Sequence, residues 1–264
     1  MRNNTIKLNG LTVSYHEEGT GNPIVLLHGF CGSKEYWDNL ITMLSKSSRV
    51  IALDLPGHGE SSNLEGIITI EDFVDHIKSL LDYLNIEQVT MLGHSLGGYI
   101  ALAFAEKYGQ MLNGFSLIHS TAFPDSEEAK KGREEGVKKV ENEGVPAFIA
   151  GLIPKLFSPE NVEKNHTDIQ TAKEIGYKTS SQGVMKTLIA MKDRPDRNFV
   201  LEKATIPVLL IAGEKDQIIP SERTFSVSKP TIKQVLLKDS GHMSMYENPT
   251  PLLNHMMDFL DTLK

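Results

Sequence analysis

Two glycines flank a serine at a distance of two residues on either side, in the segment Gly93-His94-Ser95-Leu96-Gly97. An apolar run at residues 89–92 precedes this segment, and a helical pattern at residues 98–108 follows it. A serine on such a tight strand-to-helix turn occupies a sparsely populated backbone conformation, and side chains two positions away would collide. Because glycine removes that collision, the sequence predicts a sharp bend that exposes the Ser95 hydroxyl.

The predicted bend is typical of a nucleophile elbow. A helix that begins directly after the serine points free N–H groups and the positive end of its dipole toward a forming oxyanion. With 21 glycines in 264 residues, a chance match to Gly-x-Ser-x-Gly remains an alternative. The interpretation therefore depends on three further features of the chain.

The first of these is a glycine-rich segment, residues 28–33, directly after an apolar run at residues 24–27. Acyl transfer needs two N–H donors that point at one developing oxyanion. We expect one from Leu96, the residue after the serine, and the other from Phe30 in this segment. An ordinary glycine-rich connection is the alternative interpretation.

The other two features supply a candidate acid and a candidate base. Asp216 follows a predicted strand at residues 208–211, and His242 follows a predicted strand at residues 234–237. A carboxylate there can orient a histidine and stabilise its charged form. Glu214 and Asp239 are rival acids, but Asp216 lies far enough beyond its strand to reach over the sheet edge. The chain order serine, acid, histidine is the order that the elbow fold uses. Four other histidines are weaker candidates for the base, because they flank glycine turns or fall within predicted helices: His28, His94, His76 and His255.

Predicted strands and helices alternate along most of the chain, which indicates an α/β fold with a mostly parallel central sheet of about eight strands and helices on both faces. The predicted strands are residues 5–8, 11–16, 24–27, 50–53, 89–92, 115–118, 208–211 and 234–237, and the main helices are residues 33–44, 70–84, 98–108 and 250–263.

Between residues 123 and 197 the strands stop and charged helical segments follow, including one at residues 125–143. We expect a helical cap at 123–197, inserted after strand six, and an α/β core at 1–122 and 198–264. Apolar cap residues at helical spacing should mostly pack the cap onto the core, while a few line an acyl pocket. These residues are Phe148, Ile149, Leu152, Ile153, Leu156 and Phe157.

The charge and composition of the chain limit the kinds of partner and the compartment that we expect. A net charge of −7 argues against nucleic acid. The single cysteine, Cys31, fits a reducing compartment, and the sequence shows neither a secretory signal nor an apolar run of membrane-spanning length. We expect a cytoplasmic protein, monomeric or homodimeric, without a membrane partner. No metal-ligand or phosphate-loop motif is present in the sequence, so no cofactor and no metal are predicted.

Taken together, these segments resemble the α/β-hydrolase superfamily over essentially the whole chain. The resemblance includes Asp54-Leu55-Pro56-Gly57-His58-Gly59-Glu60-Ser61, which is similar to the family's loop after its fourth strand. It implies a Ser95–His242–Asp216 triad, an oxyanion hole from Phe30 and Leu96, and a helical cap between strands six and seven. Some members carry the acid after strand six, but here that strand ends Ile118-His119-Ser120-Thr121, so Asp216 is preferred.

The predicted function is a serine hydrolase that cleaves small to medium carboxylic esters through an acyl-enzyme intermediate. Alternatives on the same scaffold are a lactonase, a C–C bond hydrolase, a perhydrolase, a menaquinone-pathway-type lyase and a slow-hydrolysing ligand receptor. That lyase group carries an arginine where this chain has Tyr99, and a serine nucleophile disfavours dehalogenation and epoxide opening. The substrate pocket is predicted to include neighbours of the proposed catalytic groups and of the cap entrance: His28, Gly29, Phe123, Ile218 and Met243.

Overall fold

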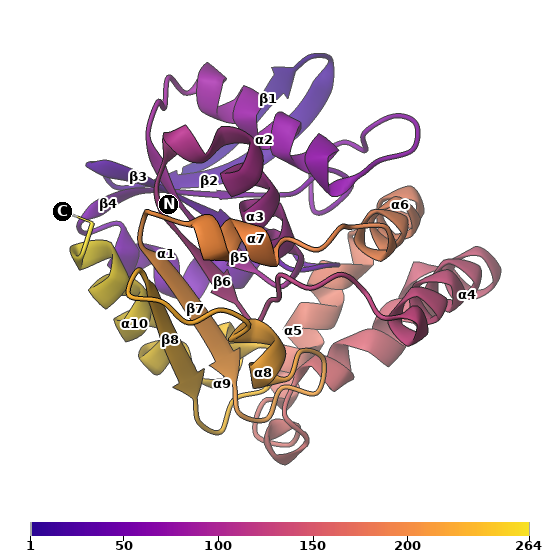
Figure 1. Ribbon diagram of the computed structural model, residues 1–264. Helices are drawn as coiled ribbons and strands as arrows, with labels where there is room; N and C mark the ends of the chain where they lie inside the picture. The colour runs from indigo at the N-terminus through magenta and orange to yellow at the C-terminus, as the bar shows by residue number, and fades with distance from the viewer. Residues whose placement is uncertain (1, 264) are drawn as a thin grey trace.

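An eight-stranded sheet runs through the computed structural model, which describes residues 2–263 (Figure 1). The spatial order is β1-β2-β4-β3-β5-β6-β7-β8. β1, β2 and β4 pair antiparallel, and every neighbouring pair from β4 to β8 is parallel. The strands are β1 (Arg2–Leu8), β2 (Leu11–Glu18), β3 (Asn22–Leu27), β4 (Ser48–Leu53), β5 (Val89–His94), β6 (Leu112–Ile118), β7 (Val208–Gly213) and β8 (Ile232–Leu237).

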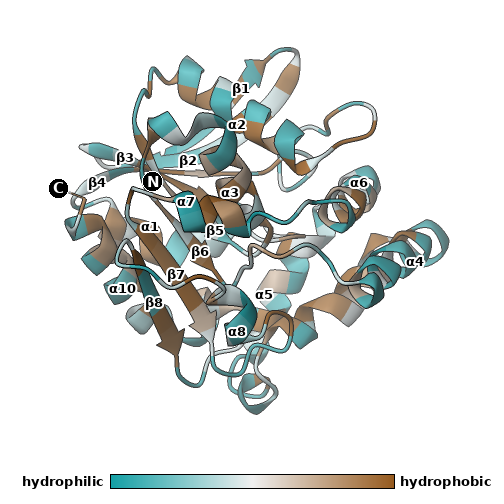
Figure 2. Cartoon of the chain, viewed as in Figure 1, coloured by the Kyte–Doolittle hydropathy of each residue, from teal (hydrophilic) through white to brown (hydrophobic). Residues whose placement is uncertain are grey.

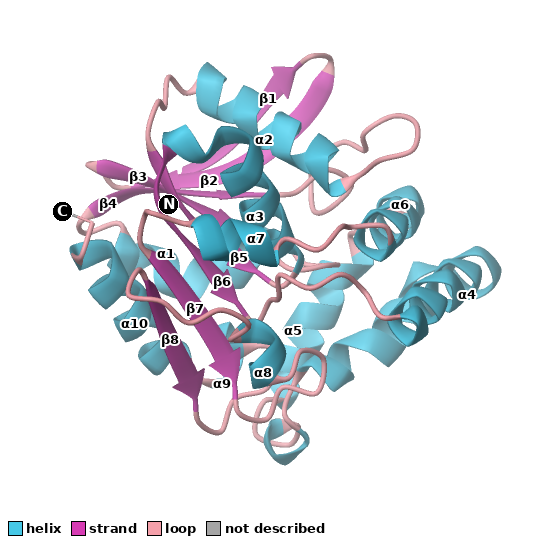
Figure 3. Cartoon of the chain, in the orientation of Figure 1, coloured by secondary structure: helices cyan, strands magenta, loops and turns pink. Residues whose placement is uncertain are grey.

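Helices lie on both sides of the sheet (Figure 3). α1 (Asp38–Leu44) contacts α10 (Pro249–Asp261), while α3 (Leu96–Tyr108) contacts both α2 (Ile70–Tyr83) and α7 (Asn198–Lys203). Two single-turn helices, α8 (Ser221–Thr224) and α9 (Ser244–Glu247), follow β7 and β8. Short 3-10 helices occur at Lys34–Trp37, Gly109–Met111, Ile153–Leu156 and Pro159–Asn161. In the described part of the chain, no helix combines the length and the hydropathy that a membrane span requires.

The predicted alternation is confirmed, with strands that extend two or three residues beyond the expected bounds at one end. Between β6 and β7 the described chain contains helices and no strand: α4 (Glu127–Leu152), α5 (His166–Tyr177) and α6 (Ser181–Lys192) precede α7. These three helices group together on the side toward which β6 and β7 point (Figure 1). Much of α4 is hydrophilic, as expected for a helix with a solvated face (Figure 2).

Two helix predictions need correction. The segment predicted as one helix at residues 33–44 is a 3-10 turn followed by α1. The helix predicted to end at residue 143 continues to Leu152 through a kink at Gly144, where φ is 81°. Pro146 lies two residues later, in the first turn after the kink. Backbone N–H groups in a first helical turn have no acceptor within the helix, so the missing N–H of proline costs no hydrogen bond there.

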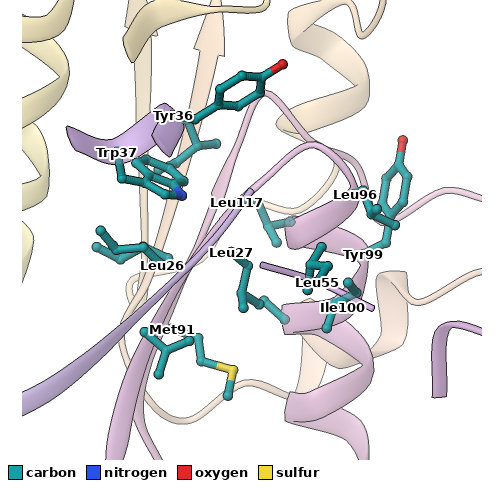
Figure 4. Packing of buried hydrophobic residues seen from close by; sticks show 14 of the residues in the cluster. Leu26, Leu27, Tyr36, Trp37, Leu55, Met91, Leu96, Tyr99, Ile100 and Leu117 are labelled. Atoms are coloured by element: carbon teal, nitrogen blue, oxygen red, sulfur yellow. The ribbon is translucent and has the colours of Figure 1, made fainter. Parts of the chain in front are cut away.

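The core is built on strands that are apolar on both faces. Leu26 and Leu27 of β3 are fully buried and point to opposite sides of the sheet, as the two-residue period of a strand requires. Leu26 lies beside Trp37, and Leu27 lies on the side of Ile100 in α3 (Figure 4). Burial on both faces is the reason that the central strands read as continuous apolar runs.

A buried ion pair joins the loops that follow β3 and β4. Lys34 Nζ lies 2.7 Å from Asp54 Oδ2, and the side chains are 3% and 0% exposed. The backbone N–H groups of Lys34 and Glu60 also donate to the Asp54 carboxylate, at 2.8 and 2.9 Å. This network fixes the segment that follows Phe30 against the loop after β4.

We predict that Lys34→Ala lowers the free energy of unfolding by about 3 kcal/mol, because it leaves the Asp54 carboxylate buried without its cation. The matched control is Lys78→Ala, which removes an exposed pair with Asp82 on α2 and should cost less than about 1 kcal/mol. Urea denaturation of both variants measures the difference. Equal effects would show that the buried pair contributes no more than a surface pair.

Candidate active site

Ser95 lies at the junction of β5 and α3, with φ 51° and ψ −111°. Its N–H donates to the carbonyl oxygen of Ile118 at 2.9 Å, and its own carbonyl oxygen accepts from Ser120 Oγ at 2.7 Å. These two hydrogen bonds tie the bend to the end of β6, the neighbouring strand. A positive φ is costly for a residue with a side chain, and the hydrogen bonds help to hold it.

The glycines around Ser95 have no room for a side chain. A Cβ at Gly93 would lie 2.2 Å from the carbonyl oxygen of Gly97, and a Cβ at Gly97 would lie 2.3 Å from that of Leu27. Backbone atoms cannot yield as a flexible side chain does. The collision that the sequence pattern predicts at these two positions is therefore present in the structure.

Asp216 and His242 meet at the carboxyl ends of β7 and β8. His242 Nδ1 lies 2.7 Å from Asp216 Oδ2, and both side chains are almost completely buried. The other carboxylate oxygen of Asp216 accepts from the N–H groups of Ile218 and Ile219, at 2.8 and 3.0 Å. The rival acids Glu214 and Asp239 are exposed, and Glu214 instead accepts from the Asp239 N–H at 3.4 Å.

Burial alone would raise the pKa of the Asp216 carboxyl, but His242 and His119 outweigh it by charge and hydrogen bonding and hold the pKa well below its ordinary value. A depressed pKa keeps the folded-state carboxylate ionised well into the acidic range, so the stability that it contributes is lost only as pH falls through that low value. Asp216 is therefore ionised wherever a histidine can act as a base.

Ser95 and His242 line the same cavity, which has a volume of about 50 Å³. The predicted oxyanion residue Phe30 lines it too. Leu96 is the first residue of α3, so its N–H has no acceptor within the helix. The cap covers this cavity with side chains from three helical segments: Arg133, Leu152, Leu156 and Met191.

Comparison with known proteins places this geometry in a family. Residues 22–142 match the family model described as the alpha/beta hydrolase fold. A thermophilic esterase from Thermogutta terrifontis shares 29% identity with a TM-score of 0.93, covering 100% of this chain and 99% of that one. The chain has the α/β-hydrolase fold and is similar to members of that family.

Curated relatives of this α/β-hydrolase include proteins with different names. The (E)-2-((N-methylformamido)methylene)succinate hydrolase of Acinetobacter baylyi is 24% identical, over 99% of both chains. The dihydrolipoyllysine-residue acetyltransferase component of the acetoin cleaving system of Pseudomonas putida is 27% identical over 91% of this chain, which spans 64% of that protein's length. The family and the structural neighbours support hydrolase activity.

Sequence reasoning missed one group at the site of this α/β-hydrolase, the histidine that follows β6. His119 Nδ1 lies 3.4 Å from Asp216 Oδ2, and His119 Nε2 lies 2.7 Å from Ser244 Oγ. Burial lowers the pKa of His119 and outweighs the negative charge of Asp216, which would raise it. The lowered pKa favours a neutral His119 ring. The signal was present, because His119 ends the strand beside β7 and the carboxyl ends of parallel neighbours share one edge.

His119, Asp216 and His242 also form a group of side chains, within residues 2–263, whose ligand atoms are close enough to hold a metal ion, within 4.8 Å of one another. Two of these atoms, His242 Nδ1 and Asp216 Oδ2, are already joined at a hydrogen-bond distance. The arrangement fits a proton held between an imidazole and a carboxylate, and a metal would have to replace that hydrogen bond.

The five predicted pocket residues lie in different surroundings. Ile218 lines the serine cavity, but His28, Gly29, Phe123 and Met243 line neither it nor the larger pocket beside it in the described structure. His28 is structural, because its Nδ1–H donates to the Gly29 carbonyl at 2.7 Å and its Nε2 accepts from the Leu55 N–H at 2.9 Å. Met243 is fully buried in the core.

The remaining two positions, Gly29 and Phe123, lie beside residues that line these spaces. A Cβ at Gly29 would lie 2.6 Å from His94 Nδ1 and 3.3 Å from Ser95 Cβ, so this glycine lies against the His94 ring and beside the Ser95 bend. The ring of Phe123 lies 5.1 Å from the Arg223 guanidinium. Two cap residues that the sequence offered as pocket candidates, Leu152 and Leu156, do line the serine cavity, whereas Ile149, Ile153 and Phe157 are buried in the core.

We predict that Gly97→Ala lowers the free energy of unfolding by about 2 kcal/mol or more, because the added methyl group meets the Leu27 backbone. Gly109→Ala is the control, since a Cβ there meets nothing within 4 Å and φ is −54°. Thermal denaturation compares the two. A Gly97→Ala protein as stable as the control would show that the bend tolerates a side chain.

Proposed function

We propose that this α/β-hydrolase cleaves small to medium carboxylic esters, with Ser95 as nucleophile, His242 as general base and Asp216 as the group that orients His242. The observation that carries the proposal is a single cavity lined by Ser95 and His242, with Asp216 hydrogen-bonded to the far side of the imidazole. An esterase neighbour that covers the whole chain supports the same class.

In the proposed mechanism, Ser95 Oγ attacks the ester carbonyl while His242 Nε2 accepts the hydroxyl proton. The tetrahedral intermediate collapses, and His242 returns that proton to the leaving alcohol. Water then attacks the acyl-enzyme with His242 again as base, and the acid leaves. Asp216 holds Nδ1 of His242 protonated, so Nε2 is the nitrogen that faces the serine.

The oxyanion of the intermediate needs two donors. We assign these to the N–H groups of Phe30 and Leu96, each worth on the order of 3 kcal/mol in the transition state. The buried Lys34–Asp54 pair supports the first donor, because it anchors the loop that carries Phe30. The α3 dipole supports the second, since its positive end points at the same place.

A lactonase uses the same bond cleavage on a cyclic ester and is the nearest alternative. C–C bond hydrolysis, perhydrolysis, the lyase reaction and slow hydrolysis by a receptor would use the same serine and histidine with other ligands. The turnover rate separates an enzyme from a receptor, because an enzyme cycles at about 1 per second or faster. We still predict from the composition that the protein is cytoplasmic, is a monomer or homodimer, and binds neither nucleic acid nor membranes. The single cysteine, Cys31, on which the predicted compartment depends, is buried.

We predict that Ser95→Ala lowers kcat for 4-nitrophenyl acetate at least about 10⁴-fold, since the nucleophile is lost. Ser79→Ala on α2, where the hydroxyl donates to the Asp75 carbonyl, is the control and should retain activity. Release of 4-nitrophenolate measures both. Turnover by Ser95→Ala at the wild-type rate would assign catalysis to another group.

We also predict that Asp216→Asn lowers kcat about 10⁴-fold, because an amide favours the wrong tautomer of His242. The control is Asp239→Asn: Asp239 is exposed and has φ 54°, a conformation that asparagine tolerates. Circular dichroism checks that both variants fold. A larger loss from Asp239→Asn than from Asp216→Asn would reverse the assignment of the acid.

A further inference from the structure

We propose that the ester substrate carries a carboxylate on its acyl part and that Arg133 binds this carboxylate; the inference rests on the proposed esterase function. Arg133, in α4, lines the cavity of Ser95 and His242. It also lines an adjoining pocket of about 510 Å³ under the cap. A cation at the junction of these two spaces is placed to bind an anion close to the reacting carbonyl.

The Arg133 guanidinium is held at one nitrogen and free at the other two. Its Nε donates to Asp125 Oδ2 at 3.1 Å. Among residues 2–263, no atom accepts a hydrogen bond from its Nη1 or Nη2. An arginine fixed through Nε presents its two terminal groups as a fork, which matches the two oxygens of a carboxylate.

Asp125 does not neutralise this site, because it is shared with a second arginine. Arg194 Nη1 lies 2.6 Å from Asp125 Oδ1, and both side chains are nearly fully buried. Arg194 also donates to the carbonyl oxygens of Met191 and Phe123 and stacks on the Tyr99 ring at 3.9 Å. The hydrogen bonds of Arg194 are therefore made within the protein. Together, Arg133, Asp125 and Arg194 carry a net charge of one positive unit.

A third arginine adds to the positive electrostatic potential of the larger pocket. Arg223 also lines the larger pocket, and its terminal nitrogen donates to the Pro124 carbonyl at 3.1 Å. Three arginines and one carboxylate line this space, in a chain whose net charge is −7. A cationic pocket within an acidic protein raises the local concentration of anionic ligands.

The shape of the site limits the acyl part to a short chain. The cavity at Ser95 is about 50 Å³, and three apolar side chains line both it and the larger pocket: Phe30, Leu152 and Ile218. A few methylene groups can pack against these side chains between the carbonyl at Ser95 and a carboxylate at Arg133. The substrate class is thus a half-ester of a short dicarboxylic acid, such as monomethyl glutarate.

The reaction of that compound balances without a cofactor. Ser95 Oγ forms a bond to the ester carbonyl carbon, and the C–O bond to methanol breaks, with the serine proton carried to methanol by His242. Water then cleaves the acyl-enzyme, so monomethyl glutarate and water give glutarate, methanol and one proton. Arg133 stays paired with the distant carboxylate throughout both steps.

The test compares monomethyl glutarate with methyl glutaramate, a neutral ester in which a carboxamide replaces the carboxylate. Methanol release gives kcat/KM for each ester with the wild type, Arg133→Gln, Arg133→Lys and Lys131→Gln. Lys131→Gln is the charge-matched control, because Lys131 is exposed on the same helix and lines neither the serine cavity nor the larger pocket. The discriminating quantity is the ratio of the two kcat/KM values for each protein.

We expect a wild-type ratio that favours the carboxylate ester, and a fall of about 10- to 100-fold in Arg133→Gln, as loss of a charge-assisted hydrogen-bonded pair implies. Arg133→Lys should restore part of the ratio, and Lys131→Gln should keep it. A wild-type ratio near one, or a ratio that Arg133→Gln leaves unchanged, would overturn the proposal while the esterase function stands.

A binding measurement keeps the two proposals separable if neither ester is hydrolysed. Glutarate should raise the melting temperature of the wild type and of Lys131→Gln in a saturable way, and should not raise that of Arg133→Gln. Absence of turnover with such binding would contradict the esterase function and support the anion site. Equal stabilisation of all three proteins would contradict the anion site.

Discussion

The site depends on one backbone constraint, the positive φ of Ser95 between β5 and α3. Nothing larger than hydrogen fits at Gly93 or Gly97, because carbonyl oxygens occupy the space that a Cβ would need. The hydrogen bond from the Ser95 N–H to Ile118 then fixes the bend to the neighbouring strand. The bend places Ser95 at the wall of the cavity under the cap.

The parallel sheet supplies the other groups in a regular manner. β5, β6, β7 and β8 are successive neighbours, and the loop or bend after each of them carries one group of the site: Ser95, His119, Asp216 and His242. Asp216 lies between two histidines, which keep its carboxyl ionised despite burial. The cap closes this edge and contributes Arg133, so the core determines the chemistry that we propose and the cap determines the acyl group.

Sequence patterns predicted the fold, the bend and the meeting of Asp216 with His242, because each depends on local geometry or on strand order. Four of the five predicted pocket residues line neither the serine cavity nor the larger pocket, and their surroundings give a physical reason. The side chain of a residue next to a catalytic group in sequence can point into the core, as that of Met243 does. It can also form hydrogen bonds with the backbone, as that of His28 does. The cap supplies part of the lining, and its helices pack by tertiary contacts that no single segment encodes. Arg133 became visible only through those contacts, whereas the order of the strands could have pointed to His119.

The central claim, that Ser95 is the nucleophile, is tested most directly by covalent labelling. The protein is incubated with a fluorophosphonate, which reacts with activated serines, and the modified peptide is identified by mass spectrometry. The account predicts one phosphonyl group per chain, located on Ser95, and loss of ester hydrolysis in proportion to labelling. A label on another residue, or full activity after stoichiometric labelling of Ser95, would contradict it.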